Sequence, residues 1–136
     1  MIKCFVINLD RRRDRLKKIS SHLHKNHFRF ERFSAIDAEN ESLSELSKNI
    51  LQYGPMGKIS KGDLACFQSH YKLWKHIAEN ENYPVLILED DSYISKTGFK
   101  LLKNIEWIPP DSNIIKCERF GNSRHKVLLS PSLKSF

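Results

Sequence analysis

The chain has 136 residues, of which 40% are hydrophobic and 29% are charged, a balance typical of a soluble globular protein. Its length permits one domain with a substantial core, so we expect residues 1–136 to form a single domain, and no stretch of the sequence approaches transmembrane length. The formal net charge of +7 favours anionic partners, namely phosphates, acidic lipid headgroups or nucleic acid, without choosing among them.

The cysteines indicate a reducing compartment. Cys4, Cys66 and Cys117 are widely spaced and odd in number, and they form no CxxC pair, which argues against a disulfide framework or a zinc site. The apolar start of the chain is short and charged residues follow it at once, so it lacks the long apolar core of a signal peptide. We therefore expect a cytoplasmic protein.

The first expected elements are a strand over residues 2–8 and an amphipathic helix after it. Asp10 is the expected N-cap, and Leu16, Ile19 and Leu23 repeat at spacings of three and four. Four arginines between residues 11 and 15 are unfavourable at a helix N-terminus unless a negative charge lies nearby. A bound diphosphate would supply that charge, and the alternative is a solvated basic face.

A second strand is expected over residues 29–34, a short helix over 39–51, and a turn-rich connection over 53–57. The longest helix is expected from about residue 60 to residue 80. Its predicted core stripe consists of Leu64, Phe67, Tyr71, Trp74 and Ala78. Ser69 and His70 resemble a nucleophile and its base, but neighbouring helical residues diverge by about 100°, which disfavours a serine hydrolase.

Residues 85–91 are the stretch around which the chain is organised. Four apolar residues run directly into Glu89, Asp90 and Asp91. The unbroken apolar run predicts a strand buried on both faces, with the acids at its carboxyl end, where open α/β sheets bind ligands. Adjacent carboxylates repel one another unless a cation or a basic group neutralises their charge. A hard divalent cation such as Mg²⁺ or Mn²⁺, shared with a phosphate, is the natural partner. The alternative is a solvated acidic turn.

The remaining chain predicts a short amphipathic helix over residues 98–107, a strand over 113–117 and a last apolar run over 127–129. The alternation of strands and helices indicates an α/β fold, a mostly parallel sheet flanked by helices. If the first strand and the acidic strand are adjacent and parallel, the polar clusters that follow them meet at one edge.

Four segments, in order and spread over nearly the whole chain, resemble the family 25 glycosyltransferases of the lipooligosaccharide galactosyltransferase type. They are VINLDRR at 6–12 with DR at 14–15, FSAIDA at 33–38, GDLACFQSHYKLW at 62–74 and VLILEDD at 85–91, and Arg13 departs from the family pattern, which often has proline there. The resemblance implies a GT-A, Rossmann-like nucleotide-sugar fold. It also implies transfer of galactose from UDP-galactose to a saccharide hydroxyl on a lipid-linked lipooligosaccharide or lipopolysaccharide core.

The resemblance also implies which residues serve the donor. Glu89 and Asp91 stand where the family's acidic motif holds Mn²⁺ (or Mg²⁺) against the diphosphate of the UDP-sugar. Donor binding is assigned to Asn8, Asp10, Arg11, Arg15, Ser69, His70 and Asp90. The catalytic base is unassigned, with His70 as the one candidate.

Family members continue past the position of residue 136, so we expect a truncated copy with an incomplete sheet that self-associates. Peripheral contact with an anionic membrane is a further expected interaction, and nucleic acid is not an expected partner.

A catalytically inactive, nucleotide-sugar-binding remnant is the main alternative. A basic nucleic-acid-binding module is disfavoured because no RNP, KH or zinc-finger pattern occurs. A two-component receiver domain is disfavoured because its acidic cluster lies near the start of the domain, well before the phosphoacceptor aspartate. Here Asp111, just after two prolines, is the one aspartate that follows the acidic cluster in the sequence.

Overall fold

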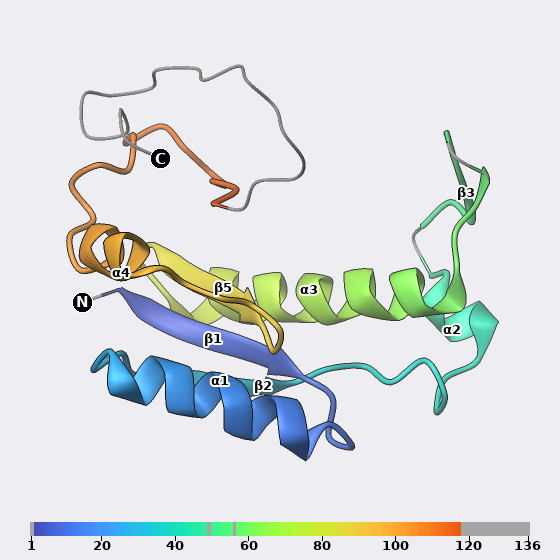
Figure 1. Cartoon of the computed structure of the whole chain (residues 1–136). Coiled ribbons are helices and arrows are strands. Elements are labelled where there is room, and N and C mark those ends of the chain that lie inside the picture. The colour runs from blue at the N-terminus through green and yellow to red at the C-terminus, as the bar shows by residue number, and fades with distance from the viewer. Residues whose placement is uncertain (1, 49, 56, 118–136) are drawn as a thin grey trace.

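The computed structural model describes residues 2–48, 50–55 and 57–117 (Figure 1). In chain order its elements are β1 (Lys3–Asn8), α1 (Arg13–Lys25), β2 (Glu31–Ser34), α2 (Leu43–Leu46), β3 (Tyr53–Gly54), β4 (Gly57–Lys58), α3 (Lys61–Asn80), β5 (Val85–Glu89) and α4 (Lys96–Leu102). The predicted last apolar run at 127–129 lies outside the described residues.

The main sheet has the strand order β2-β1-β5, and both pairings are parallel. In the register, Ile7 of β1 lies opposite Glu89 of β5, while Asn8 lies opposite Ser34 of β2. The carboxyl ends of all three strands are therefore level with one another. This arrangement confirms the predicted α/β class with a parallel sheet flanked by helices.

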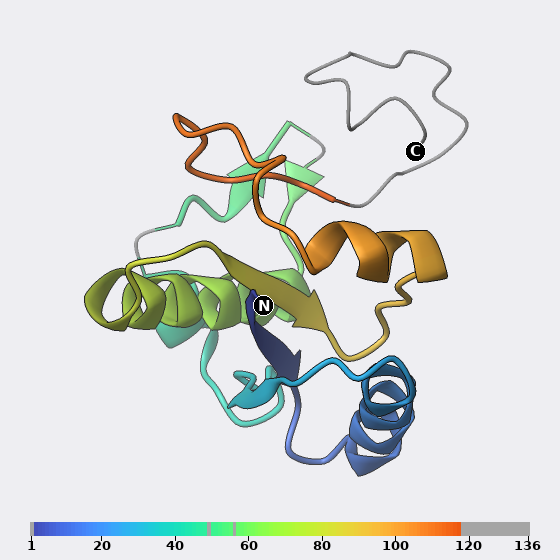
Figure 2. The same cartoon turned by 90° about the vertical axis from the view of Figure 1, so that its left-hand side faces the viewer.

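Helices cover both faces of this sheet (Figure 2). On β1, Cys4 and Val6 pack in one core with α1, α4 and β5, whereas Phe5 and Ile7 pack in a second core with Leu73 of α3. The period of two in a strand sends neighbouring side chains to opposite faces, which produces the three layers. The strand buried on both faces is thus β1; β5 lies at the edge of the described sheet, and its burial is less complete.

Helix α3 begins where the sequence predicts, because the Ser60 hydroxyl accepts a hydrogen bond from the backbone N–H of Asp63 and caps the helix. Its predicted core stripe is confirmed at Leu64 and wrong at the other four positions. The buried side chains are Leu64, Ala65, Ser69 and Leu73. Phe67, Tyr71 and Trp74 are instead exposed and contact one another as a surface row, and Ala78 is exposed too. Among the described helices, none combines the length and apolarity that a bilayer crossing requires.

Two further expectations are corrected. Asp10 does not cap α1, whose N-cap position is Arg12, because the Asp10 carboxylate is engaged by Arg32 and Ser34 beside it. Residues 113–117 form no strand in the part of the chain that the structure describes, and Ile114 is 77% exposed. The turn-rich segment forms a small antiparallel pair, β3 with β4.

We expect a large loss of stability when a side chain is shortened in the core between α1, α4 and the sheet. Leu23 of α1 is fully buried there, so Leu23→Ala should lower the free energy of unfolding by about 2–5 kcal/mol, measured by urea denaturation. Leu51→Ala is the matched control, because Leu51 is 83% exposed and its loss should change stability by no more than about 0.5 kcal/mol. Equal losses in the two variants would contradict the described packing.

Candidate functional site

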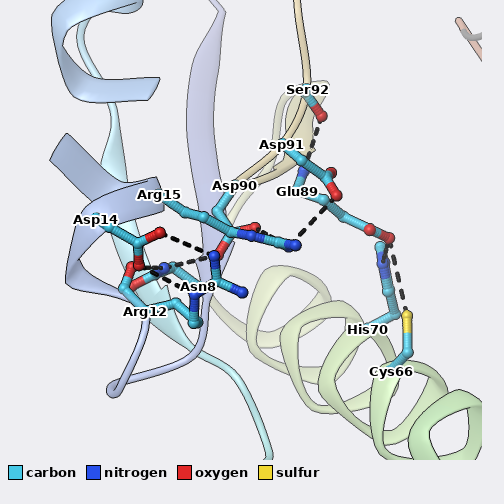
Figure 3. A network of polar contacts seen from close by, with 10 residues as sticks. All are labelled: Asn8, Arg12, Asp14, Arg15, Cys66, His70, Glu89, Asp90, Asp91 and Ser92. Atoms are coloured by element: carbon cyan, nitrogen blue, oxygen red, sulfur yellow. Dashed lines mark hydrogen bonds and ion pairs between the residues drawn. The ribbon is translucent and has the colours of Figure 1, made fainter. Parts of the chain in front are cut away.

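The carboxyl edge of the sheet is built around a contact between the ends of β1 and β5 (Figure 3). Asn8 is 2% exposed, and its Nδ2 donates to Oδ2 of Asp90 at 2.7 Å. Asp90 is 8% exposed, so this hydrogen bond is shielded from water. Because β1 and β5 are parallel and in register, the sequence prediction that their polar clusters meet at one edge is confirmed.

Asn8 also holds the neighbouring elements in place. Its Nδ2 donates to the backbone carbonyl of Arg12 at 3.0 Å, just before α1, and its Oδ1 accepts from Nε of Arg32 at 3.0 Å. Arg32 in turn pairs with Asp10, which also accepts from the Ser34 hydroxyl at 2.7 Å. The Arg32 and Ser34 hydrogen bonds hold the pKa of Asp10 below its usual value, so this acid is ionised at neutral pH.

Arg15 bridges the two aspartates that follow β5. Its Nη1 lies 3.2 Å from Oδ1 of Asp90 and 3.4 Å from Oδ2 of Asp91. The Arg15 side chain is 40% exposed and the Asp91 side chain is 62% exposed, so both reach solvent at the sheet edge. Arg15 can therefore contact a bound anion while it neutralises the acids beside it.

Protein carboxylates already pair with Arg11 and Arg12. Arg11 lies 2.5 Å from Asp37 and 3.1 Å from Glu39, and Arg12 lies 2.8 Å from Asp14. The Arg12 hydrogen bond lowers the pKa of Asp14 to about 2. A bound diphosphate is thus not required to explain these arginines, although it can still compete for them.

An open hollow of about 600 Å³ adjoins Asn8 between α1 and β2. Its lining is mostly polar and basic, consisting of Asn8, Asp10, Arg13, Leu16, Lys17, Ser20 and Arg32. Such a lining suits a phosphate-bearing ligand.

A second cluster lies on the other side of Glu89, where the end of β5 meets α3 (Figure 3). Nε2 of His70 is 3.0 Å from Oε1 of Glu89, and Sγ of Cys66 donates to the same oxygen at 3.8 Å. The His70 contact is the main reason that the pKa of Glu89 is lowered. Burial, followed by the Glu89 charge, raises the pKa of the Cys66 thiol.

The predicted site residues divide among these surroundings. Asn8, Arg15, Asp90 and Asp91 share one network, which Arg32 extends to Asp10. His70 and Glu89 form the second cluster, and Arg11 points to Asp37. Ser69 lies on the buried face of α3. Its hydroxyl donates to the Ala65 carbonyl at 2.7 Å and accepts from the backbone N–H of Ile36 at 2.9 Å.

Sequence reasoning missed two residues of this edge, Arg32 and Cys66. The spacing of Cys66 and His70, four positions apart on a predicted helix, already places them on one face. No local signal links Arg32 to Asp10, because that pairing depends on the register of β1 with β2.

Glu89 and Asp91 present exposed carboxylate oxygens at the carboxyl end of β5. About half of the Glu89 side chain and 62% of the Asp91 side chain are exposed at the carboxyl end of β5. Exposed carboxylate oxygens are the donors that Mg²⁺ and Mn²⁺ prefer, so the residues present fit such an ion.

Comparison with known proteins gives a consistent result. Residues 1–132 match the sequence model of glycosyltransferase family 25, described as LPS biosynthesis protein. The chain is similar to the Haemophilus influenzae lipooligosaccharide biosynthesis protein lic2B, with 29% identity over 126 residues that cover 87% of this chain and 46% of that protein. It is also similar to Homo sapiens procollagen galactosyltransferase 2, with 28% identity over 122 residues that cover 82% of this chain and 20% of that protein. The chain thus spans less than half the length of these curated relatives.

The Asn8 network predicts a stability loss that depends on burial. Asn8→Ala removes a donor from the buried Asp90 carboxylate and should lower the free energy of unfolding by about 1–3 kcal/mol, measured by urea denaturation. Asn40→Ala, at an exposed turn, is the control and should stay within about 0.5 kcal/mol of the parent. A parent-like Asn8→Ala variant would show that the amide does not hold this edge together.

The His70–Glu89 contact predicts a pH effect of defined sign. A carboxyl whose pKa is lower in the folded state stabilises the fold above its unfolded pKa and loses that contribution as pH falls through the folded value. Because the His70 hydrogen bond favours the charged form of Glu89, His70→Ala should raise the pKa of Glu89 and remove this contribution to stability. The pKa is read from the side-chain carboxyl signal of Glu89 in an NMR titration. His76→Ala, on the same helix but outside this contact, should leave the Glu89 signal unchanged; an equal rise in both variants would argue against the pairing.

Proposed function

The chain belongs to glycosyltransferase family 25, and from this premise we propose that it transfers galactose from UDP-galactose to a hydroxyl of a lipooligosaccharide or lipopolysaccharide core saccharide. The names of the relatives support each half of this proposal. One is a lipooligosaccharide biosynthesis protein and the other a procollagen galactosyltransferase.

One observation carries the proposal for this chain's own residues, namely the Asn8–Asp90 junction at the carboxyl edge of the parallel sheet. Open α/β sheets bind nucleotides at this edge, and a GT-A arrangement of the donor would use it. Arg15 beside the junction, and Arg13 and Lys17 in the adjoining hollow, supply positive charge for the diphosphate.

Glu89 and Asp91 would hold Mn²⁺ or Mg²⁺ in this proposal. When bound, such an ion stabilises the negative charge that develops on the departing nucleoside diphosphate. Arg15 contributes to the same end, because it lies against Asp90 and Asp91 and can turn toward a phosphate oxygen.

His70 is the group at this edge suited to accept a proton from the acceptor hydroxyl. The Glu89 carboxylate, 3.0 Å away, would stabilise the positive charge that His70 gains when it takes up that proton. We further propose that the enzyme works at the cytoplasmic face of an anionic membrane, which its net charge of +7 would attract.

Metal-dependent donor binding is the direct test. UDP should bind the parent chain more tightly with Mn²⁺ than without it, measured by isothermal titration calorimetry. Asp91→Asn should weaken the Mn²⁺-supported binding by at least about tenfold, because a ligand oxygen is lost. The control Asp111→Asn changes an exposed acid that follows the described helices and should bind like the parent. Identical UDP affinity in all three proteins would contradict the assignment.

Transfer itself is tested separately with UDP-galactose and a lipooligosaccharide core acceptor, with product mass as the readout. A mass increase of one hexose is expected. Metal-dependent UDP binding without any transfer or donor hydrolysis would instead indicate a donor-binding protein without catalysis.

A further inference from the structure

We propose that Cys66, His70 and Glu89 form a three-ligand site for Zn²⁺, at the junction of α3 and β5. The site is distinct in chemistry from the oxygen-only pair of Glu89 and Asp91. It rests on the geometry of three side chains and not on the family.

The two distances from the Glu89 oxygen to the other ligand atoms are close to those that a tetrahedral zinc ion requires. With ordinary Zn–N, Zn–O and Zn–S bond lengths, two ligand atoms lie about 3.4 Å apart for N and O, and about 3.6 Å apart for S and O. Nε2 of His70 and Oε1 of Glu89 are 3.0 Å apart, and Sγ of Cys66 and the same oxygen are 3.8 Å apart. All three ligand atoms lie within 4.8 Å of one another. Small side-chain rotations therefore bring them to coordination distance.

Two regular elements hold these ligands. Cys66 and His70 are four residues apart on α3 and project from one face of the helix. Glu89 ends β5 opposite Ile7 of β1, and its backbone N–H donates to the Ser92 hydroxyl at 3.2 Å. Ligands on a helix and a strand keep their separation without a loop rearrangement, which lowers the cost of assembling the site.

The ligand types select the metal. A thiolate and an imidazole favour zinc and its neighbours in the transition series over Mg²⁺ and Mn²⁺, which prefer oxygen. Coordination replaces the thiol proton of Cys66, which passes to solvent. Three protein ligands leave a fourth position for water or an incoming oxygen ligand, and Cys66 is exposed enough for an ion to enter.

Glu89 belongs to both sites, so zinc at the α3 junction would withdraw it from the hard cation of the donor site. That consequence rests on the proposed function. The zinc site itself does not, and it can be tested without any nucleotide.

The test replaces zinc with Co²⁺, whose spectrum reports its ligands. Titration of the reduced full chain with Co²⁺ should produce a thiolate-to-cobalt charge-transfer band and the intense visible bands of a four-coordinate ion. Equimolar Zn²⁺ should abolish these bands, whereas a large excess of Mg²⁺ should not. Cys66→Ser should lose the charge-transfer band, and the control Cys117→Ser, which changes the other exposed cysteine, should retain it. Asp91→Asn should also retain it, which separates this site from the donor site.

Thiol protection provides a second measurement that needs no Cys66 variant. Zn²⁺ should slow alkylation of Cys66 in the parent but not of Cys117, measured by peptide mass spectrometry, and His70→Gln should remove that protection. The proposal is overturned if the parent shows no charge-transfer band, if the band survives in Cys66→Ser, or if zinc protects both exposed cysteines equally.

Discussion

The buried amide of Asn8 joins the central strand to both neighbouring strands and to the start of α1. A desolvated amide that lacks a partner is costly, so each of these contacts constrains the others. A slip of β1 by one residue would turn Asn8 to the opposite face and break all of them at once. The positions of Asp90, Arg32 and the first turn of α1 at the carboxyl edge follow from this constraint.

The acids of this edge already have side-chain partners before any ligand arrives. Arg15 faces two aspartates on one side of the junction, and His70 faces Glu89 on the other. An anion and a cation that bind together can exchange partners with these pairs, the anion taking the arginine and the cation taking the acids. Such an exchange leaves few charges unpaired, whereas either ion alone would leave an excess of one sign. This is a physical reason for the binding of a diphosphate and a metal ion to be coupled.

Local patterns predict the elements of this chain well, but they do not predict the contacts between distant segments. The apolar runs of β1 and β5, and the Ser60 cap of α3, identify elements that the structure confirms. The spacing of residues on α3 does not identify its core face, because the buried row and the exposed aromatic row both repeat at three and four. The aromatic row contains the larger hydrophobic side chains, which is why the sequence favours it. The role of Asp10 depends on Arg32, and the role of Cys66 depends on Glu89, at separations of 22 and 23 residues. No local rule covers such pairs.

The order of the strands has a consequence for biosynthesis. Of the three described strands of the main sheet, the central one, β1, is synthesised before the other two, and Asp90, the partner of its Asn8 beside β5, is 82 residues away. β1 can pair with β2 early, but its second edge stays open until β5 has been translated. Contacts of this separation slow folding, and an unpaired apolar edge is prone to aggregation during that interval. We therefore expect the nascent chain to be a client of ribosome-associated chaperones until the acidic strand has emerged.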